Sequence, residues 1–506
     1  MARRSYDFIV VGAGSAGCAV AEGLASAQSG RILVLEAGPS DRVPWVRMPF
    51  GLVWMMGSKR RDWRYQSAPQ QGLNGRVLGI PRGRMLGGSG SINSMVWFRG
   101  RRADFDNWSV PGWTWSDVEP AFEEVESRLQ PRRLSGAHPL TEALSGLFAG
   151  NDLQSLPNPE REGAGVFEYN LHRGRRWSPA DAFLRPALAR DVQVMTGYQV
   201  AKIGLTGDRA SFVVLNDGTR IDAAKGVILS AGSIGSPEIL LKSGVGPADD
   251  LRAAGVTAVH PLEGVGANLH DHPTAGIHYE GAGSGYGPVP RLAHRWAAAP
   301  FQWLLAGRGI FASPTVEGGG FFNAAGNGGE PDVQSHFIPF RLPHDGRRYA
   351  RRQGYFADVC VCRPKSRGAL RLTRQGLSID LGIFNDETDL DLLTTGYMRL
   401  RSLMAEADLG PHQAPEVAPG ASVANFEQAR AHIRANAATA YHPVGTMRMG
   451  VDADAPVTAR LKVRGLERLW VADASVMPAV TSANTNAPSM MIGHRAAAMI
   501  AADCAV

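Results

Sequence analysis

A short run of mostly hydrophobic residues near the start of the chain ends abruptly at a glycine. The run at 6–11 is rich in β-branched side chains, which predicts a buried strand. Small residues then predict a helix over 18–26, and a second apolar run at 31–35 predicts another strand that closes on Glu36. This order of elements is that of a βαβ unit, which belongs to a parallel sheet.

The pattern becomes irregular after this unit. Prolines punctuate residues 37–112, which breaks helices and predicts a loop-rich segment that wraps a surface or a ligand. Helical spacing resumes at 116–126. Alternating hydrophobic residues predict strands that return to a sheet at 192–194, 200–203, 211–215 and 226–229. The middle, 275–385, mixes strands with Gly- and Pro-rich loops, and helices are predicted over 427–436 and 490–502.

Composition places the chain among folded globular proteins. Its 506 residues are 44% hydrophobic and 20% charged, and the mean hydropathy of −0.14 argues against long disorder and a polytopic membrane protein. The 60 glycines follow no three-residue period, so they predict tight turns rather than collagen. The longest uncharged stretch, 474–494, carries prolines and asparagines that are costly in lipid, so no transmembrane helix is predicted.

The charge pattern does not favour nucleic-acid binding. The net charge is +6, and the many arginines are scattered among acidic residues rather than gathered in a tail or stripe. The densest basic cluster is assigned to a solvated loop in preference to a polyanion site. Its members are Arg341, Arg347, Arg348, Arg351 and Arg352.

The four cysteines do not form a metal-binding pattern, although Cys360 and Cys362 make a C-x-C pair. Cys18, Cys360, Cys362 and Cys504 lack a second pair or nearby histidines at the spacing that zinc requires, so no metal site is predicted. A reduced, cytoplasmic protein is the simplest interpretation. Peripheral contact with the inner membrane stays open.

The first candidate for chemistry is the glycine-rich turn after the first strand. Gly12, Gly14 and Gly17 have the G-x-G-x-x-G spacing, in which the glycines permit a tight turn, a close approach of the backbone to a pyrophosphate and close helix packing. Glu36 follows at the distance expected of a carboxylate that accepts hydrogen bonds from ribose hydroxyls. The motif predicts dinucleotide binding and does not choose between FAD and NAD.

A second glycine cluster at 82–93 exposes backbone N–H groups suited to a pyrophosphate or the edge of a flavin ring. Continued to Gly100, it resembles the first signature of the glucose-methanol-choline (GMC) flavoprotein oxidoreductases. Further segments resemble that family in order along the chain: 232–246, 265–273, 364–368, 441–446 and 471–488. Residues 48–75 are most similar to the bacterial choline dehydrogenase and aliphatic alcohol dehydrogenase branch, although the stretch from 129 to 167 is short for that branch.

The resemblance implies an α/β fold in which a Rossmann-type FAD-binding domain carries an inserted mixed-sheet (α+β) substrate domain. The FAD-binding domain comprises 1–150, 192–274 and 441–506, the last with the catalytic residues. The substrate domain comprises 151–191 and 275–440. FAD is expected without a covalent link, because Ile92 stands where some relatives carry the histidine that attaches the flavin.

The FAD-binding residues are predicted in all three parts of that domain. They are Gly12, Gly14, Ser15, Ala16, Gly17, Glu36, Ala37, Arg84, Gly87, Gly88, Ser91, Asn93, Met95, Val96, Val200, Ala231, Gly232, Asp473, Ala474, Asn484 and Thr485. For Val200 a plain core position, and for Asp473 a helix cap, are the alternatives.

The candidate base is His442. Alcohol oxidation removes a hydroxyl proton, a task that suits an imidazole, while the flavin takes a hydride from the same carbon. By resemblance, His442 occupies the catalytic histidine position of the family, and Asn484 occupies the partner position filled by asparagine or histidine. His272 is assigned to a turn, and His270, His336 and His344 are given no partner. Five aromatic residues are equally compatible with a pocket or with the core: Trp54, Trp97, Phe98, Phe322 and Tyr441.

The predicted function is FAD-dependent oxidation of a primary alcohol to its aldehyde, with electrons passed to a quinone-type acceptor. One alternative is an oxidase of aryl or furanyl alcohols that uses O2 and forms H2O2. Another, from a different class, is a GMC-like lyase or flavin photodecarboxylase, and a third is a nonenzymatic nucleotide-binding module. The particular alcohol and the oligomeric state do not follow from the sequence.

Overall fold

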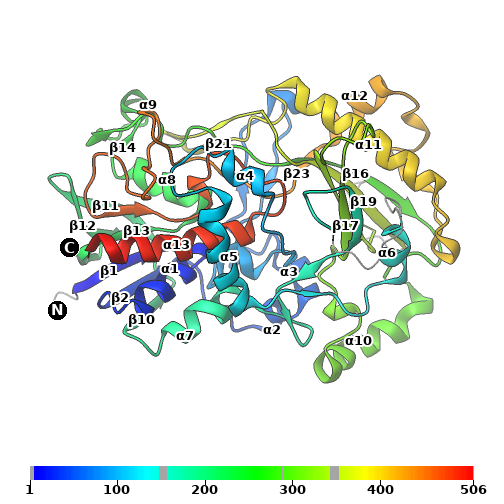
Figure 1. The fold of residues 1–506 in the computed structure, drawn as a ribbon, viewed down its shortest axis with the longest axis horizontal. Coiled ribbons are helices and arrows are strands. Elements are labelled where there is room, and N and C mark those ends of the chain that lie inside the picture. The colour runs from blue at the N-terminus through cyan, green and yellow to red at the C-terminus, as the bar shows by residue number, and fades with distance from the viewer. Residues whose placement is uncertain (1–4, 147–156, 288, 342–352, 505–506) are drawn as a thin grey trace.

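The computed structural model describes residues 5–146, 157–287, 289–341 and 353–504. Two large sheets dominate these residues and lie at opposite ends of the molecule (Figure 1). Helices cover both sheets, and the chain passes between the two ends several times. The fold is therefore α/β, as the sequence predicted.

The first sheet is the mainly parallel one, with strand order β10-β2-β1-β13-β12-β11 and β24 paired with β13. The parallel pairs join β1 (Ser5–Val11) to β2 (Ile32–Glu36) and β13 (Arg220–Leu229), β2 to β10 (Val192–Thr196), and β13 to β24 (Leu469–Val471). The antiparallel strands β11 (Val200–Thr206) and β12 (Arg209–Leu215) complete the sheet. Every strand predicted from the pattern of 6–35 and 192–229 is present.

Two helices that are far apart in the sequence pack together on this sheet. They are α1 (Ser15–Ser26) and α13 (Asn486–Cys504), drawn in blue and red in Figure 1. A Cβ added to Gly23 would lie 2.5 Å from the Cβ of Ala497, and one added to Gly493 would lie 2.3 Å from the carbonyl oxygen of Ala16. Small residues therefore let the first and last helices of the chain touch.

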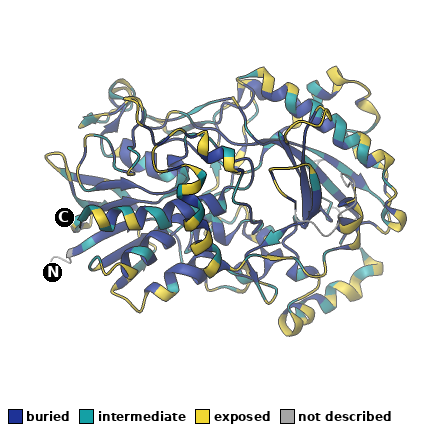
Figure 2. Cartoon of the chain, viewed as in Figure 1, coloured by how far each residue is buried: buried dark blue, intermediate teal, exposed yellow. Residues whose placement is uncertain are grey.

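The second sheet is antiparallel, with strand order β22-β16-β19-β18-β17-β6 and β23 paired with β16. It comprises β6 (Gly163–Val166), β16 (Pro273–Glu280), β17 (Gly318–Phe322), β18 (Val333–Ile338), β19 (Gly354–Val361), β22 (Glu416–Ala418) and β23 (Ala438–Thr439). One side packs against α11 (Glu387–Glu406), where Gly396 approaches the side chains of Val333 and Val359. Figure 2 shows both sheets buried and the outer faces of α10 (Ala293–Ala306), α11 and α12 (Phe426–Asn436) exposed.

The structure differs from the sequence prediction at helix starts and in several helices that were not predicted, among them α8 (Gly232–Lys242), α10 and the 20-residue α11. Prolines in the loop-rich segment begin helical turns rather than preventing them, because Pro44 and Pro49 occupy the first positions of α2 (Pro44–Arg47) and η1 (Pro49–Gly51), where no N–H is needed. Helix α10 was not predicted. Its consecutive alanines favour helix, and its buried Trp303 anchors it.

Four further features considered in the sequence are membrane-spanning helices, metal sites, cysteines and the basic cluster. Within the described ranges, no helix is long and apolar enough to cross a membrane, and no group of three or more His, Cys, Asp and Glu side chains is placed to hold a metal ion. All four cysteines are free thiols. In the basic cluster Arg341 lies beside Glu280, and Arg347, Arg348, Arg351 and Arg352 lie outside the described residues, as does His344.

Candidate active site

A cavity of about 1120 Å³ lies between the two sheets and is lined by residues from both. Its walls run from the first glycine turn and Glu36 at one end to the strands β16, β18 and β19 at the other. Ligand pockets for one small molecule usually measure about 300–1,000 Å³. The cavity therefore has room for an extended cofactor together with a small substrate.

The first glycine turn has the geometry that a pyrophosphate requires. Gly12 has a φ of +101°, and an added Cβ would lie 2.5 Å from the carbonyl oxygen of Ser230. A Cβ on Gly17 would lie 2.0 Å from the carbonyl oxygen of Gly12, so no larger residue fits at this position. At Gly14 the nearest atom is 3.9 Å away, so this backbone is open on the side of the cavity, at the N-terminus of α1.

Glu36 stands at the end of β2 beside the same turn. Its Oε2 accepts from the Ala13 N–H at 3.0 Å, and its Oε1 accepts from the Gly38 N–H at 2.8 Å. Burial raises the pKa of the carboxyl to about 7, and these two hydrogen bonds oppose that shift. Glu36 lines the cavity where a ribose is expected.

The second glycine cluster packs directly on the first. Gly88 has a φ of +53°, and a Cβ there would lie 2.7 Å from the Cα of Gly14. Arg176, a fully buried side chain that the sequence analysis did not single out, fixes the following loop. It donates from Nη1 to Asn93 Oδ1 at 2.7 Å and from Nη2 to the Asn93 carbonyl oxygen at 2.7 Å.

A buried donor without a partner lies beside this part of the cavity. Asn486 lies on the cavity wall, at the start of α13, and its Oδ1 accepts from Ser15 Oγ at 2.7 Å. Its Nδ2 makes no hydrogen bond to any described residue. An amide donor beside open backbone N–H groups suits an anionic phosphate, so the residues present fit a flavin dinucleotide.

Most of the residues predicted to bind FAD border the cavity. Those that line it are Gly12, Gly14, Ser15, Ala16, Glu36, Ala37, Gly88, Asn93, Met95, Val96, Val200, Ala231, Gly232, Asp473, Ala474, Asn484 and Thr485. Gly17, Arg84, Gly87 and Ser91 do not line it, and they support the loops from behind. Arg84, for example, lies over the ring of Trp63, and Ser91 Oγ donates to the Leu86 carbonyl.

Asp473 lines the cavity and caps two helices at once. Its Oδ1 accepts from the Ser475 N–H at 2.8 Å, and its Oδ2 accepts from the Gly232 N–H at 2.8 Å and from Ser236 Oγ at 2.6 Å. The capping alternative named for this residue is therefore present in the structure. Any contact that Asp473 makes with a cofactor comes in addition to these bonds.

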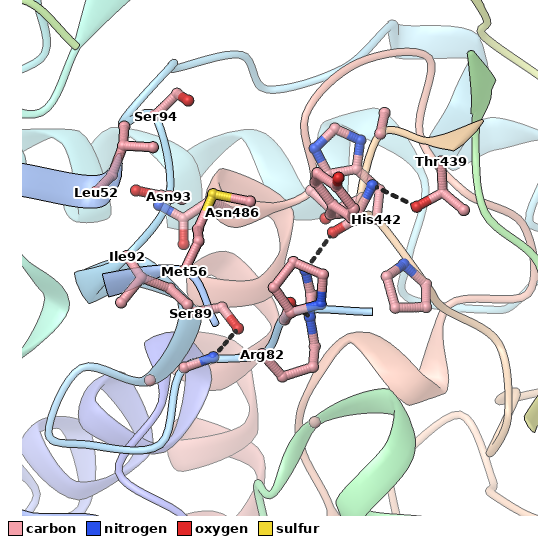
Figure 3. Close-up of a pocket in the computed structure, with 18 of the residues that line it drawn as sticks. Leu52, Met56, Arg82, Ser89, Ile92, Asn93, Ser94, Thr439, His442 and Asn486 are labelled. Carbon is pink, nitrogen blue, oxygen red and sulfur yellow. Dashed lines mark hydrogen bonds between the residues drawn. The ribbon is translucent and has the colours of Figure 1, made fainter. Parts of the chain in front are cut away.

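At the other end of the cavity His442 faces the loop that carries Ile92 and Asn93 (Figure 3). The chain approaches His442 from β23, which pairs with β16, and so comes beside His272. The two Nδ1 atoms lie 3.0 Å apart. His272 Nε2 lies 3.1 Å from the carbonyl oxygen of Cys362, to which it must donate because a carbonyl only accepts.

This hydrogen-bond order fixes the proton positions on both rings. A neutral His272 that donates from Nε2 has a lone pair on Nδ1, so the Nδ1–H of His442 must be the donor between the two rings. His442 then keeps its lone pair on Nε2, which lies 3.2 Å from Asn484 Nδ2. The Oδ1 of Asn484 accepts from Gln334 Nε2 at 3.4 Å, which orients the amide with its donor toward His442.

Both rings are held neutral. Burial lowers the pKa of His442 well below its ordinary value, and positive charge on His272, His336 or Arg82 would lower it further. Burial also lowers the pKa of His272 to about 4. At neutral pH the site therefore offers an acceptor, His442 Nε2, beside a donor, Asn484 Nδ2, a pair that can hold one hydroxyl group and take its proton.

The role of the second sheet in this site was not predicted from the sequence. His272 was assigned to a turn and His336 had no partner, yet His272 touches His442, and His336 Nδ1 lies 2.8 Å from Asp358 Oδ1 on the cavity floor. Only strand pairing brings these residues together. Of the five uncertain aromatic residues, Trp54 and Tyr441 line the cavity, while Trp97, Phe98 and Phe322 are buried elsewhere.

Comparisons with known proteins agree over nearly the whole chain. Family models described as GMC oxidoreductase match residues 6–274 and 364–493. The chain is 34% identical to an alcohol dehydrogenase [acceptor] of Pseudomonas putida, over 98% of this chain and 95% of that protein. It is 35% identical to an oxygen-dependent choline dehydrogenase of Rhizobium johnstonii, over 97% and 94%.

Solved structures share the fold. Pyridoxine 4-oxidase from Mesorbium loti superposes with a TM-score of 0.85 at 26% identity, over 97% of this chain and 98% of the other. Formate oxidase of Aspergillus oryzae superposes with a TM-score of 0.87 at 22% identity, over 99% of both chains. The second likeness concerns the fold alone.

Proposed function

Because this chain belongs to the GMC oxidoreductase family, whose members are FAD-dependent enzymes, we propose that it oxidises a primary alcohol to its aldehyde. His442 acts as the base, Asn484 holds the hydroxyl oxygen, and the electrons pass to a quinone-type acceptor. The observation that carries this proposal is the hydrogen-bond chain from Cys362 through His272, which leaves a lone pair on His442 Nε2 beside the amide of Asn484.

His442 and Asn484 both bind the substrate hydroxyl, and only His442 accepts its proton. The substrate hydroxyl donates to His442 Nε2 and accepts from Asn484 Nδ2, and its proton moves to Nε2. When bound, FAD would supply the two-electron acceptor for the hydride of the alcohol carbon. Once His442 is charged, its Nδ1–H still donates to His272, which remains neutral because burial keeps the pKa of His272 low.

The names of the relatives support an alcohol as substrate. One is called an alcohol dehydrogenase and another a choline dehydrogenase, each near 35% identity over almost the full chain. Pyridoxine 4-oxidase is a third relative with a comparable fold.

Oxygen as the electron acceptor is the second candidate. It is favoured by the similarity to an oxygen-dependent choline dehydrogenase and to an oxidase. The quinone-type acceptor is favoured by the alcohol dehydrogenase [acceptor] relative and by the resemblance of residues 48–75. The His442 and Asn484 pair serves either acceptor, because it acts on the alcohol.

Two measurements test the proposal. Choline and aliphatic, benzylic and furanyl alcohols are mixed anaerobically with the holoenzyme, and at least one primary alcohol should bleach the flavin absorbance. A lyase, a photodecarboxylase in the dark or a nonenzymatic binding module would leave the flavin oxidised. The reduced enzyme is then mixed with air-saturated buffer, where reoxidation slower than steady-state turnover with a quinone supports the dehydrogenase, and equally fast reoxidation with stoichiometric H2O2 makes it an oxidase.

Peripheral contact with a membrane also belongs to this proposal. Helix α10 exposes Phe301, Leu304 and Leu305, and no acidic residue occurs between Gly281 and Val316, while Arg291, Arg295 and Arg308 do. A helix with an exposed apolar face, with arginines in and beside it and no acidic residue, is suited to binding at an anionic bilayer surface. Co-sedimentation with anionic vesicles that is lost in Leu305→Asp is the expected result, and no sedimentation of the native protein would contradict it.

A further inference from the structure

The floor of the cavity carries a row of three neighbouring residues, two of them with polar side chains, that the proposed alcohol oxidation does not use. Gly276 of β16 lies opposite Asp358 of β19, and Asp358 lies opposite His336 of β18. All three residues line the cavity. Residues directly opposite on neighbouring strands share one face of a sheet, so this row forms part of the floor.

One oxygen of Asp358 is fully engaged and the other is not. Oδ1 accepts from the His336 N–H at 3.1 Å and from His336 Nδ1 at 2.8 Å. Oδ2 has no hydrogen-bond partner among the described residues. The side chain of Asp358 is 14% exposed and that of His336 8%, and both residues line the cavity.

The neighbours of Asp358 leave its charge available. Phe356 and Ile338 flank it on the floor, and both are apolar. Arg341 also lines the cavity, but its Nε lies 2.7 Å from Glu280 Oε2. A carboxylate oxygen without a hydrogen-bond partner in a mostly apolar cavity is a strong site for a positively charged donor.

The row lies within reach of the reacting end of the site. Strand β16 begins next to His272, and Gly276 follows four residues later, about 13 Å along the strand at 3.3 Å per residue. His336 is close enough to His442 for its charge to lower the pKa of His442. One small molecule can therefore touch His442 at one end and Asp358 at the other.

We propose that Asp358, oriented by His336, forms a subsite for a protonated amine, so that the preferred substrate is an alcohol whose far end carries an N–H donor. This inference rests on the proposed alcohol oxidation and adds the class of substrate. The ammonium donates to Asp358 Oδ2 while the hydroxyl lies between His442 and Asn484. A neutral alcohol of the same length fills the same space and leaves Oδ2 unpaired.

The first experiment compares matched substrates. Terminal amino alcohols of two to six carbons are each paired with the neutral alcohol of equal heavy-atom count, such as aminobutanol with pentanol, and kcat/KM is measured with the holoenzyme. At the best chain length the amino alcohol should exceed its neutral partner by about 10- to 100-fold, the worth of a hydrogen bond to a charged group. Preference for the neutral partner at every length overturns the proposal.

The matched variants are Asp358→Asn and Asp332→Asn. The amide introduced by Asp358→Asn keeps an oxygen that accepts from His336, so the floor retains its fold while the charge is lost. Asp332 is a carboxylate beside the same sheet that accepts from the Ala324 N–H at 2.7 Å and does not line the cavity. Asp358→Asn should reduce kcat/KM for the amino alcohol at least tenfold more than for its neutral partner, whereas Asp332→Asn should affect both alike. Equal losses in Asp358→Asn would mean that Asp358 only supports the fold.

A binding experiment separates this inference from the proposed function. Butylammonium has no hydroxyl to oxidise, and its Kd is measured from the perturbation of the bound flavin spectrum. We expect Asp358→Asn to raise this Kd at least tenfold and Asp332→Asn to leave it within about twofold. If butylammonium binds in this way but no alcohol reduces the flavin, the proposed function fails and the subsite stands. An equal Kd in the native enzyme and Asp358→Asn refutes the subsite itself.

Discussion

The two ends of the cavity are built from different parts of the polypeptide. At the dinucleotide end the binding surface is formed mainly by backbone, in turns where Gly12, Gly17 and Gly88 leave no room for a Cβ. At the sheet end the functional groups are side chains, and His272 contacts His442 although 170 positions separate them. The glycine turns tolerate few substitutions. The side chains on the second sheet can be exchanged, and the chemistry changed, while the strands stay in register.

The difference implies that substitutions should separate cofactor binding from catalysis. Changes in the side chains around His442 should alter the rate of flavin reduction while FAD stays bound. Changes in the first glycine turn should alter FAD affinity while the bound fraction still reacts. A substitution that affects both equally would break this comparison.

The largest effect is expected from His442→Ala. Loss of a positioned base reduces a rate by about two to four orders of magnitude, so flavin reduction by the best alcohol should fall by that factor in anaerobic stopped flow. The FAD content of the purified protein should match that of the native enzyme. His260→Ala is the control, because His260 Nε2 contacts the Arg464 carbonyl and the residue does not line the cavity. Reduction of His442→Ala at the native rate would remove His442 as the base.

Asn484→Ala should cost less than His442→Ala, because the amide holds the oxygen but takes no proton. The smaller loss also distinguishes the two residues from a pair that acts only through packing. An Asn484→Ala variant slower than His442→Ala would reverse the two assignments.

The second effect concerns His272, a positioning residue. Without it the Nδ1–H of His442 loses its acceptor, and the tautomer with the proton on Nε2, which cannot take another, becomes populated. His272→Ala should therefore lower kcat by about 10- to 100-fold, the usual loss for an outer partner of a functional histidine, with a much smaller change in KM. His272→Asn, which restores an acceptor near Nδ1, should recover part of the rate. No recovery, together with a lowered Tm in both variants, would assign His272 a structural role instead.

Much of the dinucleotide end could be predicted from the sequence, because its signal is local. Gly12, Gly14, Gly17 and Glu36 lie within one βαβ unit, and the spacing itself reports the turn. The strands and the helix at 6–35 and the strands at 192–229 were also predicted, because their hydrophobic patterns are local. Helix α1 begins at Ser15, however, rather than at residue 18. The first residues of a helix carry its ligand-facing N–H groups, and no periodic pattern marks them.

The sheet end could not be predicted in this way. Nothing near residue 272 shows that β16 will pair with β23 and so bring His272 to His442, and nothing near 336 shows that its strand neighbour will be Asp358. Register between distant strands is set by the whole sheet. Arg176 was missed for a similar reason, since its partners at 90–93 precede it by more than 80 positions. The division into domains and the roles of the individual site residues stay predictions.

The third prediction concerns the cradle at Gly14. Its added Cβ would meet no protein atom closer than 3.9 Å, so Gly14→Ala should fold, but the methyl group would stand where the backbone approaches the pyrophosphate. We expect the Kd for FAD to rise about tenfold, the value of one hydrogen bond, measured by fluorescence on reconstitution of the apoprotein. The rate of reduction of the bound flavin should change less than in His272→Ala. An unchanged Kd would mean that the pyrophosphate lies elsewhere.

The fourth prediction is the pH dependence of flavin reduction. A base works when it is neutral, and burial places the pKa of His442 well below its ordinary value of 6.5, so the activity is present above that lowered pKa and lost only as the pH falls through it. Between pH 8 and pH 6 the rate should fall less than about twofold, whereas a base of ordinary pKa would lose about fourfold. Asp271, whose pKa burial raises to about 7, titrates in this window, but it accepts from the backbone N–H of His442 and not from the ring.

The smallest effect concerns the link between protein and cofactor, and it tests whether the dinucleotide end holds FAD by contacts alone. Ile92, which lines the cavity beside Asn93, has no nucleophilic atom to form a bond to the flavin. Cys18 is a nucleophile near the first turn, but it is fully buried and burial holds its thiol protonated by raising its pKa. Acid precipitation should therefore release all of the yellow colour into the supernatant. Colour that stays in the pellet, followed by a flavin peptide after proteolysis, would show a covalent link and would name the residue that forms it.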